Sequence, residues 1–207
     1  MAFERAREEM VDGLAVRERV SERTLDALRA VPRHEFVPEG RRSEAYEDRP
    51  LPIGEGQTIS APHMVAIMAE ELDPGPDERV LEIGTGRGYH AAVTAELAGS
   101  VFSVEYEPAL AEAARETLAD LGYDVAVRAG DGHRGWPEHA PYDAAYLTCA
   151  AAEFPDAVVE QVRTGGRLLA PLGGRGHQRL VSARKREGGL DREEKGGVRF
   201  VPMRGGE

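Results

Sequence analysis

The chain has 207 residues, a length at which one domain can bury a sizeable core, and no Pro-, Gly- or Ser-rich linker divides it. Its net charge of −11 at pH 7 argues against a nucleic-acid partner, because neutralising phosphates requires clustered Lys and Arg. The single cysteine, Cys149, excludes an internal disulfide and a multi-cysteine metal site, and no apolar run is long enough to cross a bilayer.

The first third of the chain favours helices and irregular segments. Its opening, MAFERAREEM, is a charged amphipathic segment rather than a signal peptide. Residues 24–30 predict a helix, while residues 41–53 are rich in Pro, Gly and charge and are expected to be irregular. The next helix is expected to begin at Ser60 or Ala61, with Pro62 in its first turn.

Strands and helices alternate through the rest of the chain. This alternation predicts an α/β domain with a doubly wound, mostly parallel, Rossmann-like sheet. Two final strands, residues 178–186 and 197–203, are expected to join through a polar turn at 188–194 as an antiparallel pair at the C-terminal end of the sheet. The other predicted strands are 80–83, one ending at 105, 125–128, 142–148 and 166–170, and the predicted helices are 89–97, 107–121 and 155–162.

The segment VLEIGTGRG, at residues 80–88, carries the strongest functional signal. Glu82 comes two positions before a turn in which Gly84, Gly86 and Gly88 let the backbone turn tightly and approach a ligand without a Cβ in the way. The helix that follows presents free N–H groups at the same place. This arrangement is typical of a strand-to-helix connection around S-adenosylmethionine.

A related turn, G-x-G-x-x-G/A, binds dinucleotides at the same place in a similar sheet. Counted from Gly84 and Gly86, its third glycine position falls on Tyr89, whose ring would obstruct helix–strand packing and pyrophosphate access. The carboxylate of Glu82 also suits a cationic ligand better than a pyrophosphate. The spacing therefore favours S-adenosylmethionine, and a strand–turn–helix without any ligand is the alternative.

Two later strand ends carry the same kind of residue. Glu105 ends the second predicted strand, where an acid holds a ribose diol in doubly wound nucleotide sites. After the third strand, Asp131 and Gly132 can set a carboxylate and backbone N–H groups beside an adenine ring. Three such strand ends on one side of a sheet predict a cofactor site there. The histidines show no ligand spacing, so no metal is indicated.

Residues 31–203 resemble the protein-L-isoaspartate (D-aspartate) O-methyltransferase family. The most specific blocks are VPRHEFVP at 31–38, AYEDRPLPIGEGQTISAPHMVA at 45–66, GDGHRGWPEHAPYDA at 130–144 and GGVRFVPM at 196–203. The resemblance implies methyl transfer from S-adenosyl-L-methionine to the free α-carboxylate of L-isoaspartyl residues in damaged polypeptides. S-adenosyl-L-homocysteine would be the product, and the ester would begin repair through a succinimide.

The resemblance also implies the residues of the site. Ser60 occupies the place of the family's active-site serine, whose hydroxyl would donate to the acceptor carboxylate, although Ser60 could instead cap the helix before Pro62. His63 is expected to contact the methionine end of the cofactor or to pack there. The expected cofactor-binding residues are Gln57, Thr58, Ile59, Ser60, His63, Glu82, Gly84, Thr85, Gly86, Gly88, Glu105, Tyr106, Asp131 and Gly132.

Five positions depart from the family's usual pattern, among them Glu153, which replaces a Pro. Arg87 replaces a Ser in GTGRG, and His133 follows GDG where Thr or Arg is commoner. Cys149 replaces a small residue, and Arg204 follows the FVPM block. Because Arg87 and His133 are expected near the cofactor, its affinity is expected to differ from that of relatives.

Two alternative functions belong to other classes. A methyltransferase of the same fold with another acceptor would have changes around Ser60 and residues 196–203, and the sequence shows few. A non-catalytic paralogue that binds the cofactor would have lost Glu82, Glu105, Asp131 or Ser60, and all four are present.

The chain is expected to form one methyltransferase domain over residues 1–207. It would comprise N-terminal helices with the acceptor and cofactor loop (1–75), a cofactor-binding core (76–175) and C-terminal strands (176–207). We expect a cytoplasmic monomer that acts on isoaspartyl polypeptides, with neither nucleic acid nor membrane as a partner.

The ionic setting is suggested by the choice of basic residues. The chain contains twenty-four Arg and only two Lys, Lys185 and Lys195. An acidic, lysine-poor surface suits concentrated salt, where at about 1 M the Debye length falls to ~3 Å and self-repulsion is screened. We therefore expect a halophilic, haloarchaeal cytoplasm. A GC-rich genome that favours Arg codons would give the same bias in an ordinary acidic protein.

Overall fold

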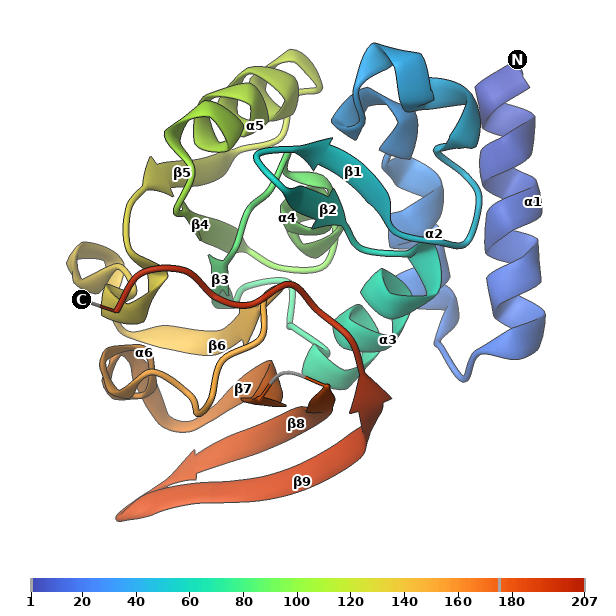
Figure 1. Ribbon diagram of the computed structural model, residues 1–207. Coiled ribbons are helices and arrows are strands. Elements are labelled where there is room, and N and C mark those ends of the chain that lie inside the picture. The colour runs from blue at the N-terminus through green and yellow to red at the C-terminus, as the bar shows by residue number, and fades with distance from the viewer. Residues whose placement is uncertain (1, 175, 207) are drawn as a thin grey trace.

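A seven-stranded sheet in the order β5-β4-β3-β6-β7-β8-β9 lies at the centre of the computed structural model, which describes residues 2–174 and 176–206 (Figure 1). Strands β5, β4, β3, β6 and β7 run parallel, and β8 and β9 continue the sheet antiparallel. The expected doubly wound sheet with an antiparallel pair at its C-terminal end is confirmed. The strands are β3 (Arg79–Ile83), β4 (Ser100–Glu105), β5 (Val125–Ala129), β6 (Tyr142–Leu147), β7 (Val162–Gly174), β8 (His177–Arg186) and β9 (Gly189–Val198).

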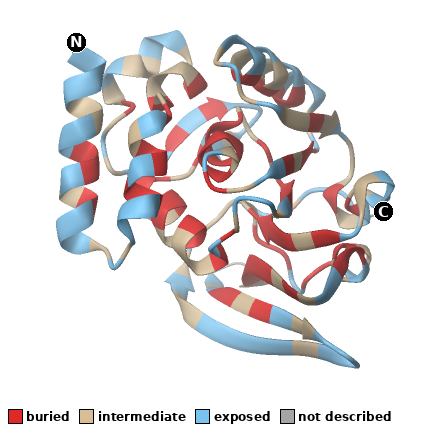
Figure 2. Cartoon of the chain, turned by 180° about the vertical axis from the view of Figure 1, so that it is seen from behind, coloured by how far each residue is buried: buried red, intermediate tan, exposed pale blue. Residues whose placement is uncertain are grey.

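Helices cover both faces of the sheet, and alternate residues of each strand point to opposite faces. On β3, Leu81 and Ile83 pack in a buried cluster with Val158 of α6, whereas Val80 packs with Met68 of α3. Figure 2 shows buried residues along the central strands and on the inward faces of the helices. The helices are α1 (Ala2–Arg17), α2 (Glu22–Ala30), α3 (Pro62–Leu72), α4 (Tyr89–Ala95), α5 (Pro108–Asp120) and α6 (Asp156–Gln161).

The segment before α3 is more ordered than its composition suggests. Short 3₁₀ helices, η1 (Arg33–Phe36) and η2 (Glu39–Glu44), lead to an antiparallel pair of strands, β1 (Leu51–Gly54) and β2 (Gln57–Ile59). The expectation of an irregular segment up to residue 53 is therefore wrong at its end. The alternation of buried and exposed residues in β1 spans only four residues. A pattern this short is a weaker signal than the Pro, Gly and charged residues around it, so the sequence predicted an irregular segment.

The C-terminal hairpin departs from the prediction in one strand. β8 covers the predicted residues 178–186, but its partner β9 is Gly189–Val198 rather than residues 197–203. The segment expected to be a polar turn is an edge strand that is exposed along most of its length (Figure 2). Charged residues on an edge strand protect it from pairing with another chain, and this polarity resembles that of a loop. Residues 199–203 instead run back across the carboxyl ends of the parallel strands, where Val201 and Met203 bond to Ala150.

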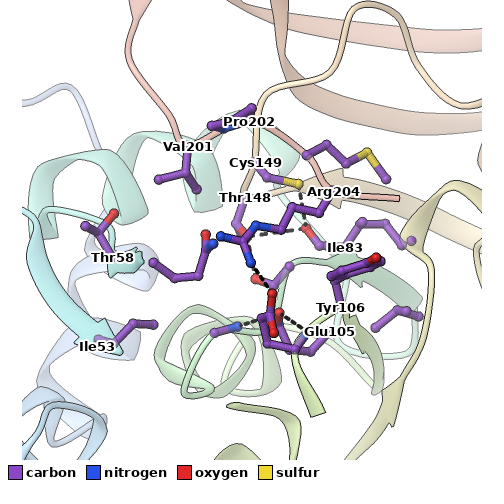
Figure 3. A pocket seen from close by; sticks show the side chains of 17 residues that line it. Ile53, Thr58, Ile83, Glu105, Tyr106, Thr148, Cys149, Val201, Pro202 and Arg204 are labelled. Atoms are coloured by element: carbon purple, nitrogen blue, oxygen red, sulfur yellow. Dashed lines mark hydrogen bonds and ion pairs between the residues drawn. The ribbon is translucent and has the colours of Figure 1, made fainter. Parts of the chain in front are cut away.

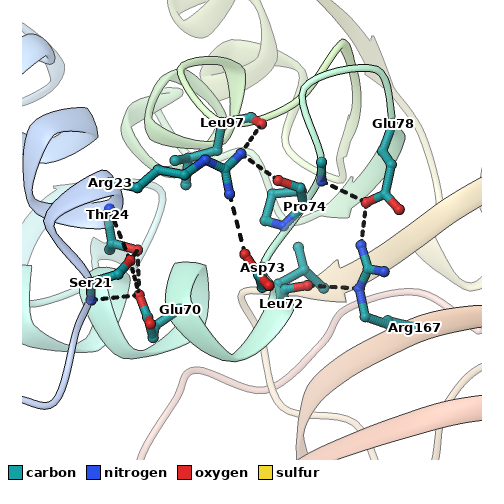
Figure 4. Close-up of polar contacts among 11 residues, drawn as sticks. Ser21, Arg23, Thr24, Glu70, Leu72, Asp73, Pro74, Glu78, Leu97 and Arg167 are labelled. Carbon is teal, nitrogen blue, oxygen red and sulfur yellow. Dashed lines mark hydrogen bonds and ion pairs between the residues drawn. The ribbon is translucent and has the colours of Figure 1, made fainter.

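Polar contacts fix the N-terminal helices against α3 and the end of α4 (Figure 4). At the start of α2, Ser21 N, Ser21 Oγ and Thr24 Oγ1 donate to one carboxylate oxygen of Glu70 in α3, at 2.9, 2.7 and 2.6 Å. Arg23 donates to the carbonyl oxygen of Leu97 at 2.5 Å. These contacts tie the start of α2 to the last turn of α3 and to the segment that follows α4.

Candidate cofactor and acceptor site

A pocket lies at the carboxyl ends of β3 and β4, and we call it the cofactor pocket (Figure 3). One wall comes from the glycine turn after β3 and the end of β4. Residues 148–149 after β6 adjoin this turn, and the returning segment 201–204 completes the wall. Its described lining comprises Ile53, Gln57, Thr58, Ile83, Gly84, Gly86, Val104, Glu105, Tyr106, Glu107, Gly132, Thr148, Cys149, Val201, Pro202, Met203 and Arg204.

The glycine turn has the backbone conformation that its sequence predicts. Gly84, Gly86 and Gly88 have φ values of 99°, 56° and 98°, in the region that only glycine adopts freely. A Cβ on Gly84 would clash with the Thr148 hydroxyl, so only glycine lets the turn pack this closely against the residues that follow β6. Gly88 does not line the pocket, since it faces Leu118 of α5 at the start of α4.

Glu105 joins the glycine turn to the end of β4. Its Oε2 accepts from the Gly86 amide at 2.7 Å, and its Oε1 accepts from the Glu107 amide at 3.0 Å. Burial raises the pKa of the Glu105 carboxyl, while these backbone hydrogen bonds favour its charged form. The carboxylate is thus held against the pocket with its geometry fixed by two backbone amides.

Glu82 lies beneath the pocket rather than in its wall. Its side chain is fully buried, and it accepts from the Ser103 hydroxyl and, at 2.8 Å, from the Tyr146 hydroxyl. Thr85 extends this buried group through a contact of 2.5 Å between its hydroxyl and that of Ser103. Burial raises the pKa of Glu82 to about 7, although the two hydroxyls that donate to it favour its charged form.

The raised pKa of Glu82 predicts a pH-dependent stability. Its stabilising contribution is fully present below the unfolded-state value of 4.5 and is lost as pH rises through the folded-state value of about 7. The ligand-free Glu82→Gln variant should gain about 2 kcal/mol of unfolding free energy relative to the parent chain between pH 5 and pH 8. Urea titrations at the two pH values measure this change. The exposed Glu116→Gln variant is the control, and an equal difference for Glu82→Gln at both pH values would contradict the prediction.

The carboxylate of Asp131 already accepts hydrogen bonds from nearby residues. Its carboxylate accepts from the His133 amide and ring at 2.9 Å each and from the Gly206 amide at 2.9 Å. The adjacent Gly132 lines the cofactor pocket, as does Tyr106, whose side chain is 46% exposed. Asp131 and His133 therefore support this corner of the pocket from behind.

A wider groove opens beside the cofactor pocket, and we call it the acceptor groove. It has a volume of about 690 Å³ and lies between the start of α3 and residues 176–179 and 197–201. Thr58 and Thr148 line both this groove and the cofactor pocket, while Ser60 and His63 line the groove but not the cofactor pocket. The two hollows thus meet at one edge of the sheet.

The hydroxyl of Ser60 is available to a ligand. The residue that caps α3 is Ala61, which contradicts the interpretation of Ser60 as the helix cap. Within the described residues the Ser60 hydroxyl makes no hydrogen bond. The amide and ring of His63 instead bond to Asp48, at 3.0 and 2.8 Å. Asp48, which the sequence did not single out, therefore satisfies the free amide at the start of α3.

A buried arginine holds the backbone of Ser60. Arg33 is completely buried and donates to the carbonyl oxygens of Ser60, at 2.9 Å, and of Ala45. Its guanidinium also lies 5.5 Å from the centre of the Tyr89 ring. Burial lowers the pKa of Arg33, so its carbonyl partners compensate a real desolvation cost. In the sequence, Arg33 was visible only as part of the VPRHEFVP block.

The expected site residues divide among three neighbouring hollows. Gln57, Thr58, Gly84, Gly86, Glu105, Tyr106 and Gly132 line the cofactor pocket; Ile59 and Thr85 line a small adjoining hollow, which Thr58, Ser60, Gly84 and Gly86 also line; and Ser60 and His63 line the acceptor groove, as does Thr58. Glu82, Gly88 and Asp131 support these walls without lining them. The sequence did not predict Thr148 or residues 201–203 in the wall, although the GGVRFVPM block contained a signal for the latter.

Residues that depart from the family pattern also lie in or near these hollows. Arg87 lines the small hollow beside Thr85, and His133 binds Asp131. Cys149 lies in the wall of the cofactor pocket, and burial raises its thiol pKa to about 12. Arg204 crosses the pocket, where it pairs with Glu107 and donates to the Glu55 carbonyl at 3.2 Å (Figure 3).

Three features lie together at one edge of this sheet: the glycine turn after β3, the acid at the end of β4, and the groove beside the cofactor pocket. Together they define the class of S-adenosylmethionine-dependent methyltransferases. The family model "Protein-L-isoaspartate(D-aspartate) O-methyltransferase (PCMT)" matches residues 5–207. The chain belongs to this family.

Individual relatives agree over nearly the whole chain. Protein-L-isoaspartate O-methyltransferase 2 of Archaeoglobus fulgidus is 48% identical over 99% of this chain and 95% of the relative. The Methanoculleus marisnigri enzyme is 52% identical over 97% of this chain and 92% of the relative. A solved protein-L-isoaspartate O-methyltransferase is 32% identical with a TM-score of 0.88, over 96% of this chain and 66% of that one. A Plasmodium falciparum structure in complex with S-adenosyl-L-homocysteine shares the fold, with a TM-score of 0.83 and 21% identity. The match covers 96% of this chain and 98% of that one.

Proposed function

We propose that this chain transfers the methyl group of S-adenosyl-L-methionine to the free α-carboxylate of L-isoaspartyl residues in damaged proteins. The observation that carries this function is identity of about half over nearly the full length of enzymes with that name. The adjoining pocket and groove supply a place for each substrate. S-adenosyl-L-homocysteine is the second product.

The residues around Ser60 suit a reaction that needs positioning more than proton transfer. The acceptor carboxylate, with a pKa near 4, is already ionised at neutral pH, so no general base has to activate it. Ser60 would donate its free hydroxyl to one carboxylate oxygen and leave the other for attack. The bound cofactor supplies the electrophilic methyl group. The walls of the groove would exclude water and hold the reactants at roughly 3–3.5 Å.

We propose distinct roles for the predicted site residues. Glu105 holds the ribose diol, Tyr106 and Gly132 flank the adenine, and Gly84 and Gly86 admit the rest of the cofactor. Gln57, Thr58 and Ile59 form the side shared with the acceptor groove, and His63 holds the start of α3 through Asp48. Glu82, Thr85, Gly88 and Asp131 support the cofactor from behind.

Repair would follow from the chemistry of the ester. In the ester the group to be displaced is methoxide, whereas a free carboxylate would have to expel oxide. The neighbouring backbone nitrogen therefore bonds to the ester carbonyl carbon, the bond to methoxide breaks, and the amide proton leaves with it as methanol, which closes a succinimide. Water then opens the succinimide, partly to normal aspartate. These steps require no group of this chain, and the catalytic site needs to perform methyl transfer alone.

The assay that tests this function follows labelled methyl from S-adenosyl-L-methionine into a short isoaspartyl peptide and its aspartyl twin. We expect label only in the isoaspartyl peptide. If neither peptide is labelled while calorimetry still detects cofactor binding, the acceptor is a different one and the proposal is wrong.

We also propose a cytoplasmic monomer of one domain that works at high salt and binds no nucleic acid. The net charge of −11 and the scarcity of lysine support the salt and nucleic-acid parts of this proposal. The large exposed apolar side chains in the described chain are Phe3, Val16 and Tyr106, and so small a set supports the monomer. None of the described helices is long and apolar enough to cross a membrane.

A further inference from the structure

The acceptor groove differs in charge from the rest of the chain. Its described lining contains Arg179 and Arg199 together with His63 and His177, and it contains no Asp or Glu. The whole chain, by contrast, carries a net charge of −11. The ionisable groups that an acceptor peptide would meet in the groove are therefore all basic.

Arg199 is the uncompensated charge in this lining. It has no hydrogen bond or ion pair with any other residue that the structure describes. Arg179 pairs with Glu194 at 3.6 Å, but their side chains are 59% and 64% exposed, and such a pair contributes only ~0–1 kcal/mol. His63 is bound to Asp48. A peptide carboxylate would therefore find a free guanidinium at Arg199.

The size of the groove leaves room for residues beside the methylated one. Its volume of about 690 Å³ lies within the ~300–1,000 Å³ of ordinary ligand sites. Phe200 and Met64 provide apolar surface in the same lining. Side chains that neighbour the isoaspartyl residue would thus reach the basic wall.

We propose that, at low ionic strength, the acceptor groove selects isoaspartyl segments with acidic neighbours, and that Arg199 is the main residue determining this preference. This inference rests on the proposed function, because it concerns the acceptor of that reaction. At about 0.1 M salt the Debye length is ~10 Å, so a nearby guanidinium attracts an acid more strongly than the distant acidic surface repels it.

The test compares two isoaspartyl peptides that differ only in having Glu or Gln on both sides of the isoaspartyl residue. Methyl transfer is measured as kcat/KM at about 0.05 M and about 1 M KCl. We expect the Glu peptide to be preferred about three- to fivefold at low salt, and equally good at high salt, as for an exposed charge pair.

Three variants assign the preference to its residue. Arg199→Gln should abolish it, Arg199→Glu should reverse it and Arg199→Lys should retain it. The matched control is Arg186→Gln at the far end of β8, where the arginine is 58% exposed and pairs with Asp191. This variant should keep the parent preference, and circular dichroism verifies that all four variants fold.

The outcomes separate the inference from the proposed function. If the Gln peptide is methylated and the Glu peptide is equal or worse at low salt, the inference is wrong and the proposed function stands. A preference unchanged in Arg199→Glu would also overturn the role of Arg199. If neither peptide is methylated while S-adenosyl-L-homocysteine still binds, the proposed function fails and the inference fails with it.

Discussion

Replacing Glu105 by glutamine is expected to weaken binding of S-adenosyl-L-homocysteine about 100-fold. The carboxylate accepts from the amides of Gly86 and Glu107, at 2.7 and 3.0 Å, and faces the pocket. A glutamine has one acceptor oxygen where the carboxylate has two. Its NH2 group would face one of the two backbone N–H groups, so a donor would meet a donor there. Hydrogen bonds to a charged group contribute ~1.5–3 kcal/mol, and a 100-fold loss corresponds to ~2.8 kcal/mol.

Isothermal titration calorimetry measures this effect directly. Glu112→Gln in α5 is the matched control, because its side chain is 63% exposed and pairs only with Arg115, one turn along the helix. It should change the dissociation constant less than twofold. A Glu105→Gln variant that is folded and binds with the parent affinity would remove Glu105 from the cofactor site.

The Ser60→Ala variant is expected to lose about 100-fold in kcat and to bind S-adenosyl-L-homocysteine within a few-fold of the parent chain. The hydroxyl has no partner in the described chain, so its removal leaves no buried group unsatisfied. In other enzymes, loss of one preorganised donor to a reacting oxygen costs ~100- to 1,000-fold in kcat. The methyl-transfer assay on an isoaspartyl peptide gives the rate, and calorimetry gives the affinity.

A thermodynamic result would distinguish two roles for Ser60. Equal losses in kcat and cofactor affinity would assign the hydroxyl to the cofactor instead of the acceptor. Ser60→Thr is a useful comparison, since it retains a hydroxyl and adds a methyl group at a position that is only partly exposed. Recovery of rate in this variant would identify the hydroxyl itself as the active group.

The sequence predicted the edge of the sheet that carries the site, and the reason is the regularity of parallel strands. In a doubly wound sheet, turns after successive strands meet at one edge, so the glycine turn, Glu105 and Gly132 had to lie together. Glu82 shows where this reasoning stops. It shares its face of β3 with Val80, whose neighbours are the buried side chains beneath α3. Its position along the strand was predictable. Its orientation away from the pocket follows from the rule that successive side chains of a strand point to opposite faces of the sheet, which the sequence reasoning did not apply to Glu82.

Other parts of the site depend on contacts that no local pattern records. Asp48 lies fifteen residues before His63 in the sequence and binds both its amide and its ring. Arg204 reaches Glu107 from ninety-seven residues away. The polar edge strand β9 has no buried face to produce a clear alternation, so its position was mistaken for a turn. Such features follow from the tertiary structure rather than from a sequence window.

The place of Cys149 has a consequence for the durability of the enzyme. Isoaspartyl residues accumulate as proteins age, and oxidation of thiols is a companion form of ageing damage. Only the thiolate reacts readily with oxidants, and a thiol whose pKa is raised to about 12 by burial remains protonated at neutral pH. The sole sulfhydryl of the chain thus lies in the wall of the cofactor pocket as a protonated thiol, the form that reacts slowly with oxidants. At this position, conversion of the thiol to a bulkier, oxidised group inside the cofactor pocket is therefore disfavoured.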